Sequence, residues 1–111
     1  MAQPHAKSGE VVSVRPLGEG LAGARTTAVL KAEQLEVVRL VLHAGKGLRE
    51  HQAPGEITVQ CLEGDVEFRM PEAVHRLRAG DFIHLRRAEP HSLLALVDSS
   101  VLVTICLDAP R

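Results

Sequence analysis

Residues that favour turns recur about every 8 to 12 positions along this chain, and their spacing constrains the fold more than any other feature. Six prolines and nine glycines stand between short runs of valine, leucine and isoleucine. Such runs suit antiparallel strands, because each run is long enough for a strand and is ended by a turn. We therefore predict an all-β protein that folds as a sandwich or barrel with little helix.

Short strands are predicted at residues 11–15, 26–31, 36–42, 57–62, 65–70, 74–77, 82–86, 92–97 and 101–107. Polarity alternates along residues 65–70, where Val66, Phe68 and Met70 share one face, so this strand should form a hairpin with residues 74–77 that has one solvated face. By contrast, three of the predicted strands carry apolar side chains at both parities. They are residues 57–62, 92–97 and 101–107. A second subunit is expected to cover their other face, so we predict a homodimer.

The length and charge of the chain narrow the possible functions. With 111 residues the chain can bury one core, so we predict a polar N-terminal arm at residues 1–10 and one barrel domain at residues 11–111. The net charge is −1 and the lysines and arginines are scattered, which argues against a nucleic-acid or acidic membrane surface. The sequence has no signal-peptide core and no apolar run of about 20 residues, so we expect a cytoplasmic protein.

Aromatic and cysteine residues are few. Phe68 and Phe82 make up the whole 2% aromatic content, so a site that stacks a planar ligand or nucleic-acid bases between rings is not expected. Cys61 and Cys106 lie in separate apolar runs, without a second cysteine at metal-ligand spacing. We predict that both are buried thiols in a reducing compartment.

Two separate stretches of the chain each carry a histidine beside a strand. Residues 45–64 contain a glycine turn, His51, a Pro-Gly turn and a strand that ends in a Glu-Gly bend. Residues 80–91 contain a Gly-Asp turn, a strand and His91 directly after a proline. A small barrel builds a site from distant parts of a chain in this way. We therefore predict that His51 and His91 converge on a shared interior site.

These two stretches resemble the motifs of the cupins. The first cupin motif, G(X)5HXH(X)3-4E(X)6G, is matched by Gly45, His51 and Gly64, and the second, G(X)5PXG(X)2H(X)3N, by Gly80 and His91. The resemblance covers roughly residues 35–107. It implies the fold of a small single-domain RmlC-like cupin, which is an antiparallel jelly-roll barrel, or double-stranded β-helix, with a metal or ligand site inside.

The metal-binding pattern that the resemblance implies is incomplete in this sequence. The second histidine of the first motif falls on Ala53 and its glutamate on Ile57, with Glu56 one residue out of phase. A shift of one residue along a strand turns a side chain to the other face, so Glu56 replaces that ligand only if a bulge compensates. The proline, glycine and asparagine positions of the second motif hold Arg86, Ala88 and Ala95.

A bound divalent transition metal would therefore be held by His51 and His91 with a third ligand from elsewhere. Such an ion, which would be iron, manganese, nickel or zinc, takes three or four nitrogen and oxygen ligands in a barrel of this kind. The candidates for the third ligand are His84, on the strand after Gly80, and Gln60, on the strand after Ile57.

Two functions agree with this pattern. The first is a protein that binds a small molecule in a mostly apolar barrel, where His51 and His91 supply directional polar contacts. The walls of that barrel are expected to include Ile57, Val59, Phe68 and Leu93. The alternative is a metal-dependent dioxygenase or isomerase that uses the same two histidines and an unidentified third ligand.

A third function is acid–base chemistry by a histidine without a metal, as the resemblance to epimerases of this fold allows. It requires a carboxylate partner for the imidazole. Asp81 and Asp98 are the candidates, and both lie in predicted turns.

Overall fold

Antiparallel strands dominate the computed structural model, which describes residues 5–107 of the chain. Its helical element is one 3-10 helix, η1 (Gly18–Gly23). The strands are β1 (Thr27–Lys31), β2 (Leu35–Leu42), β3 (Gly47–His51), β4 (Ile57–Glu63), β5 (Asp65–Met70), β6 (Ala73–Arg78), β7 (Phe82–Leu85), β8 (His91–Ala95) and β9 (Ser99–Cys106). No helix in this part of the chain is long and apolar enough to cross a bilayer.

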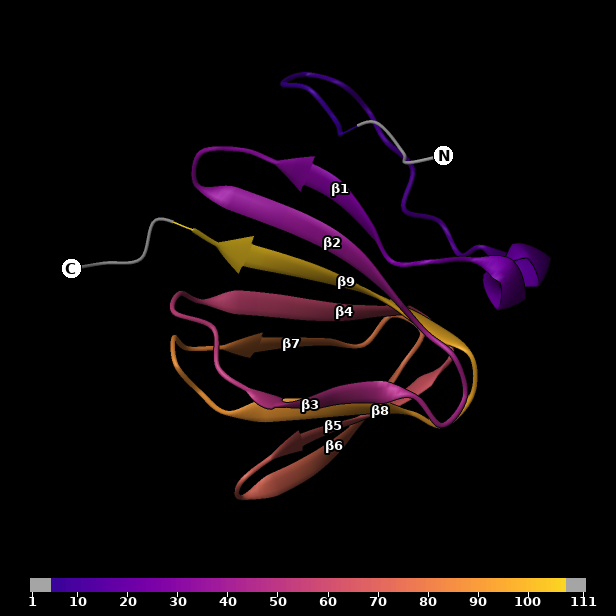
Figure 1. Cartoon of the computed structure of the whole chain (residues 1–111), viewed down its shortest axis with the longest axis vertical. Helices are drawn as coiled ribbons and strands as arrows, with labels where there is room; N and C mark the ends of the chain where they lie inside the picture. The colour runs from indigo at the N-terminus through magenta and orange to yellow at the C-terminus, as the bar shows by residue number, and fades with distance from the viewer. Residues whose placement is uncertain (1–4, 108–111) are drawn as a thin grey trace.

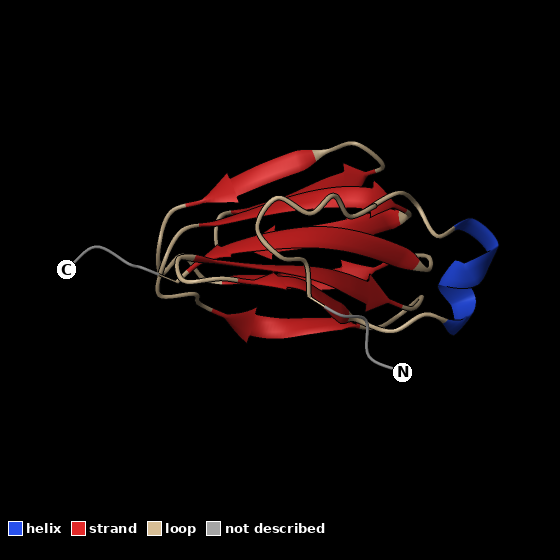
Figure 2. Cartoon of the chain, turned by 90° about the horizontal axis from the view of Figure 1, so that it is seen from above, coloured by secondary structure: helices blue, strands red, loops and turns tan. Residues whose placement is uncertain are grey.

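The strands form two stacked sheets (Figure 1). One sheet has five strands in the order β1-β2-β9-β4-β7, and the other has four in the order β3-β8-β5-β6. The pairs between neighbouring strands are antiparallel. The two layers face each other as in a jelly roll (Figure 2), which confirms the predicted all-β fold.

The core lies between the two sheets and follows the alternation of the strands. In β5, Val66 and Phe68 are completely buried, whereas Asp65, Glu67 and Arg69 keep contact with solvent. The predicted hairpin of β5 with β6 is confirmed. The buried core comprises Leu42, Ile57, Val59, Cys61, Val66, Phe68, Leu77, Leu85, Leu93, Ala95 and Val101.

Two short segments differ from the predicted strands. Residues 11–15 form no strand, because no neighbouring strand in the described part of the chain pairs with them and Val11 is 95% exposed. Conversely, β3 is a strand although Arg49 and Glu50 interrupt its apolar pattern. Its pairing with β8 stabilises the extended backbone, which local composition does not reveal.

Residues 5–26, here called the N-terminal segment, precede the first strand. The part before η1 passes over the outer side of β1 and β2, and η1 lies beyond the ends of the strands (Figure 2). The backbone N–H of Ala6 donates to the carbonyl of Val29 at 2.9 Å. At the other end, Glu63 accepts bonds from the backbone N–H groups of Leu17 and Gly18 and from the hydroxyl of Ser100. Burial by itself raises the pKa of Glu63, but these three donors and the charge of Arg39 bring that pKa below its usual value. The charged carboxylate of Glu63 therefore binds the N-terminal segment to the end of the sheet.

Candidate functional site

A β-bulge in β3 turns His51 to the face of the sheet on which His91 lies. Leu48 pairs with Leu93 and His51 pairs with His91, so three steps along β3 match two steps along β8. Without the extra residue, strict alternation would put Leu48 and His51 on opposite faces. The bulge lets both residues face the side on which His91 and Leu93 lie.

The two imidazoles face each other across the β3–β8 pair. Their ring centroids are 4.3 Å apart, with the planes tilted by 59°. On its other side, His91 stacks on the ring of Phe68, with centroids 5.4 Å apart and planes within 5°. His91 is only 3% exposed, whereas His51 is an exposed residue. A ligand would therefore approach from the side of His51. The two rings lie close together as predicted, but the predicted interior position holds for His91 alone, because His51 is exposed.

Each ring is oriented by the same backbone device. The Nδ1 atom of His51 lies 2.8 Å from the carbonyl oxygen of Arg49, and Nδ1 of His91 lies 2.9 Å from that of Glu89. Because a carbonyl oxygen only accepts hydrogen bonds, each Nδ1 carries the proton. In the neutral form, each Nε2 then has a free lone pair that can accept a hydrogen bond or bind a metal ion. Neither ring is oriented by Asp81 or Asp98, whose hydrogen bonds go to the backbone of Arg78 and Ala44.

The environment of His91 favours the neutral ring. Burial lowers the pKa of His91, because the apolar surroundings disfavour its charged form, and the nearby His51 lowers it further. The bond to the carbonyl of Glu89 opposes this shift only in part. The site thus contains at least one imidazole that stays uncharged near neutral pH.

The other two predicted polar ligands lie elsewhere. Gln60 pairs with Phe82 and Thr58 with His84 across β4 and β7, on the face opposite to the buried Ile57 and Val59. Gln60 and His84 therefore project from the outer side of the five-stranded sheet. His84 instead bonds Glu56 through Nε2 at 2.7 Å. Alternation along the chain already relates Gln60 to the face opposite Ile57, but the sequence does not set the direction of β7 and therefore did not place His84.

The predicted apolar walls belong to the packed core. Phe68 is fully buried and Ile57 is 5% exposed. Since Val59 and Leu93 are also buried, a ligand at the imidazoles would meet the edge of the core at the mouth of the barrel rather than a deep channel. Phe68 supports the site by stacking on His91.

Ala88 links the two loops that carry the histidines. It occupies the glycine position of the second motif and has a φ of 63°, in the left-handed region that favours glycine. Its N–H donates to the carbonyl of Ala53, the residue at the position of the missing motif histidine, at 2.8 Å. Ala88 thus keeps an unfavourable backbone conformation, and its hydrogen bond holds the loop before His91 against the loop after His51.

A complete set of protein ligands for a metal is not formed. Residues 5–107 contain no group of three or more His, Cys, Asp or Glu side chains that could hold a metal ion. The two Nε2 atoms suit a transition metal chemically, but water or a substrate would have to supply the remaining ligands.

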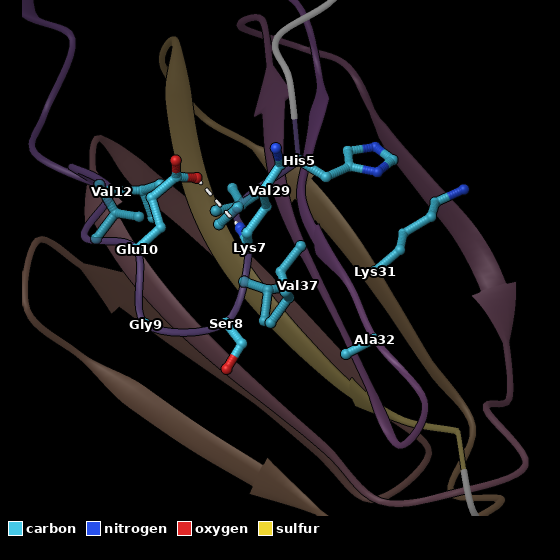
Figure 3. A pocket seen from close by; sticks show the side chains of 13 residues that line it. His5, Lys7, Ser8, Gly9, Glu10, Val12, Val29, Lys31, Ala32 and Val37 are labelled. Carbon is cyan, nitrogen blue, oxygen red and sulfur yellow. Dashed lines mark hydrogen bonds between the residues drawn. The ribbon is translucent and has the colours of Figure 1, made fainter.

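A large hollow lies on the outer side of the molecule, apart from the imidazoles (Figure 3). It has a volume of about 920 Å³ and lies between the N-terminal segment and the first two strands. Val12, Val29 and Val37 give it an apolar surface, and at its edge the N–H of Lys7 donates to Glu10. Because these residues come from the outer face of the sheet, this hollow cannot contain a ligand bound to His51.

The two cysteines differ in burial. Cys61 is completely buried, and burial raises the pKa of its thiol to about 11, so the group is unreactive. Cys106, which we also predicted to be buried, is only half-buried, because it lies on the outer side of β9 opposite Leu35. Neither cysteine forms a disulfide bond within residues 5–107.

Comparison with known proteins supports the fold. No protein-family profile and no curated protein matches the sequence. An RmlC-like cupin protein from Desulfovibrio desulfuricans superimposes with a TM-score of 0.68 at 28% identity, over 92% of this chain and 97% of that one. A cupin superfamily protein from Desulfitobacterium hafniense gives a TM-score of 0.74 at 13% identity, over 88% and 95% of the two chains. A conserved protein of unknown function from Streptococcus pyogenes gives 0.73 at 19% identity, over 100% and 99%.

Proposed function

We propose that this chain, a small cupin of the RmlC-like superfamily, binds a small molecule at the mouth of its barrel through His51 and His91. The observation that carries the proposal is the matched orientation of the two rings. Each Nδ1 is held by a carbonyl two residues earlier in the chain, and the rings lie 4.3 Å apart. Two acceptors are therefore available within reach of one ligand.

The chemistry of the site indicates the class of ligand. A neutral imidazole with a free Nε2 accepts a hydrogen bond from a hydroxyl or amino group. The apolar core beside it, with Phe68 behind His91, favours a ligand that also has an apolar part. We therefore expect a small alcohol, phenol or amine rather than a highly charged molecule.

The test is a ligand-observed NMR screen of small alcohols, phenols and amines. Compounds that bind the unchanged protein should lose at least about tenfold in affinity in His51→Ala, because one hydrogen-bonding ring nitrogen is removed from the site. His84→Ala is the matched control, since His84 is also an exposed histidine but lies on the outer face. Equal binding to all three proteins would contradict the proposed site.

The alternative is a metal-dependent dioxygenase or isomerase that uses His51 and His91. The same Nδ1 bonds favour it, because metal-binding histidines commonly donate their second ring N–H to a carbonyl or carboxylate. A bound divalent transition metal would supply Lewis-acid or redox chemistry. The residues of this chain would contribute two neutral nitrogen ligands, and the third ligand is not found among the described residues.

Elemental analysis separates the two functions. The protein is purified without a chelator or nickel resin and then incubated with iron, manganese, nickel or zinc. If the protein binds its small molecule without a metal, no metal ion should remain bound in a stoichiometric amount. One retained equivalent that disappears in the double variant His51→Ala/His91→Ala would favour the metal-dependent alternative.

A further inference from the structure

A second hollow on the outer side of the five-stranded sheet is lined by arginines. It has a volume of about 440 Å³ and lies between the N-terminal segment and strands β1 and β2. Its lining residues are Ser13, Arg15, Pro16, Leu17, Ala24, Arg25, Thr27, Val29 and Arg39. Three of them carry a permanent positive charge and none is acidic.

Arg39 is the central residue of this arginine hollow. It lies on β2 opposite Thr27 and Leu102, on the face away from Leu40 and Leu42, which pack in the core. The side chain would be exposed on the outer face of an uncovered sheet, but residues of the N-terminal segment cover it. Arg39 is consequently only 7% exposed, which is unusual for a charged residue.

The hydrogen-bonding capacity of Arg39 is largely unused by the protein. One terminal nitrogen donates to the carbonyl of Arg15 at 2.7 Å. Within residues 5–107, no carboxylate lies close enough for a salt bridge with Arg39. Glu63 is near enough to feel its charge, but the carboxylate oxygens of Glu63 bind Leu17, Gly18 and Ser100. A guanidinium has five N–H donors, so most of them remain for another acceptor.

These remaining donors open into the hollow. Among the described side chains, no fully buried nitrogen or oxygen lacks a hydrogen-bond partner. The guanidinium nitrogens of Arg39 that make no bond to the protein are therefore reached from the hollow that this residue lines. The hydroxyl oxygen of Ser13 accepts the N–H of Arg15, which leaves its own O–H as a further donor on the same lining.

We infer that the arginine hollow binds an oxyanion of the phosphate class, either a free anion or the phosphoryl group of a small molecule. Guanidinium groups match the oxygens of phosphate in pairs, and three arginines line this one hollow. The volume is within the range of small-molecule sites, so the hollow has room for more than a bare phosphate. The inference does not depend on the imidazole site, which lies on the inner side of the other sheet.

A structural role alone does not account for this arrangement. The bond from Arg39 to the carbonyl of Arg15 holds the N-terminal segment with one donor, and within residues 5–107 the side chains of Arg15 and Arg25 form no hydrogen bond or ion pair. Both of these side chains belong to exposed residues, so their replacement by glutamine should leave the fold intact.

The experiment is a titration with inorganic phosphate at constant ionic strength, followed by calorimetry and by the backbone amide NMR signals of Thr27 and Arg39. We expect saturable binding to the unchanged protein, and a loss of about tenfold or more in both Arg15→Gln and Arg25→Gln, since each variant removes a charged hydrogen-bond donor. Arg78→Gln is the control, because it removes an exposed arginine from the outer face of the four-stranded sheet.

The outcomes are distinct. Binding that is absent, not saturable, or equally strong in Arg25→Gln and Arg78→Gln would overturn the inference. A parallel titration with acetate should give weaker binding than phosphate, and equal affinity would overturn the assignment to the phosphate class. Glycerol 3-phosphate distinguishes the two sources: tighter binding than inorganic phosphate identifies a phosphorylated small molecule, and equal binding identifies the free anion.

Discussion

The outer faces of the two sheets differ in how they accommodate charge. On the four-stranded sheet, Asp65 pairs with Arg76 and Glu67 with Arg69, and all of these side chains are in contact with water. On the five-stranded sheet, Arg39 lies beneath the N-terminal segment without a carboxylate partner among the described residues. Charges on the first face are compensated by their neighbours in contact with water, whereas Arg39 on the second face is covered by the N-terminal segment.

The difference explains why some strands alternate in polarity and others do not. A sheet with one solvated face shows polar residues at every second position, as β5 does. Strands β4 and β9 carry apolar residues at both parities and have no fully exposed residue. At one end of these two strands the N-terminal segment bonds to Glu63, which in turn binds Ser100, so the chain itself covers part of their outer face. Leu35 and Phe82 remain exposed there, so a homodimer on this face stays a prediction.

The largest expected effect concerns the attachment of the N-terminal segment. Glu63→Ala should lower the free energy of unfolding by about 2–3 kcal/mol, because three donors lose a charged acceptor. Glu67→Ala, which breaks an ion pair on the solvated face, should cost clearly less. Chemical denaturation measures both. If both variants lose the same free energy of unfolding, charged groups on the two outer faces contribute equally to stability and the comparison fails.

The next effect concerns self-association. Phe82 and Val74 are similarly exposed, at 60% and 61%, but lie on the outer faces of different sheets. If a second copy covers the five-stranded sheet, Phe82→Glu should weaken the dimer by about tenfold or more, since a charge would be buried in the interface. Val74→Glu should leave it unchanged. Analytical ultracentrifugation decides, and a monomer at all concentrations would refute the homodimer.

Lowering the pH should reduce the stability of the protein in two separate steps, one from His91 in the imidazole site and one from Glu63 at the N-terminal segment. Burial lowers the pKa of His91, so the unfolded chain binds more protons and stability should fall as the pH decreases through about 6.5. The pKa of Glu63 lies below 4.5 in the folded protein, so its stabilising contribution is present above that pH and is lost as the pH falls through the lower folded value. Thermal unfolding between pH 3 and 8 should show His91→Gln without the first decrease and Glu63→Gln with a smaller second one.

The smallest effect concerns the loop that crosses from β7 to β8, between the two sheets. Ala88→Gly should stabilise the protein by up to about 1 kcal/mol, because glycine adopts the positive φ without steric cost. Ala73→Gly is the control, since at the start of β6 the same change should destabilise slightly. Thermal melts compare the two, and a destabilised Ala88→Gly variant would show that the loop is not strained.

Alternation and turn spacing predicted most of the strands, because these depend on local geometry. The proximity of His51 and His91 was predicted from the two histidine-bearing stretches and their resemblance to the cupin motifs, and it depends on the bulge in β3 and on the pairing with β8. The charged strand β3 was not predicted, since its backbone is held by β8 rather than by its own side chains. His84 and Gln60 were assigned to the site as possible third ligands, but register places both on the outer face. Alternation along β4 already gives Gln60 the face opposite to Ile57, whereas the direction of His84 depends on how β7 pairs with β4, which no local pattern contains.

The order of residues alone determined where strands and turns form and which side chains share a face, because the strand period of two is a property of the backbone. Only the tertiary structure decided which face is buried. One extra residue in β3 turns His51 to the face of His91, and a segment about 24 positions before Arg39 covers that guanidinium. Both outcomes depend on partners that are distant in the chain, and burial by such partners decides whether a polar side chain is solvated, neutral or available to a ligand.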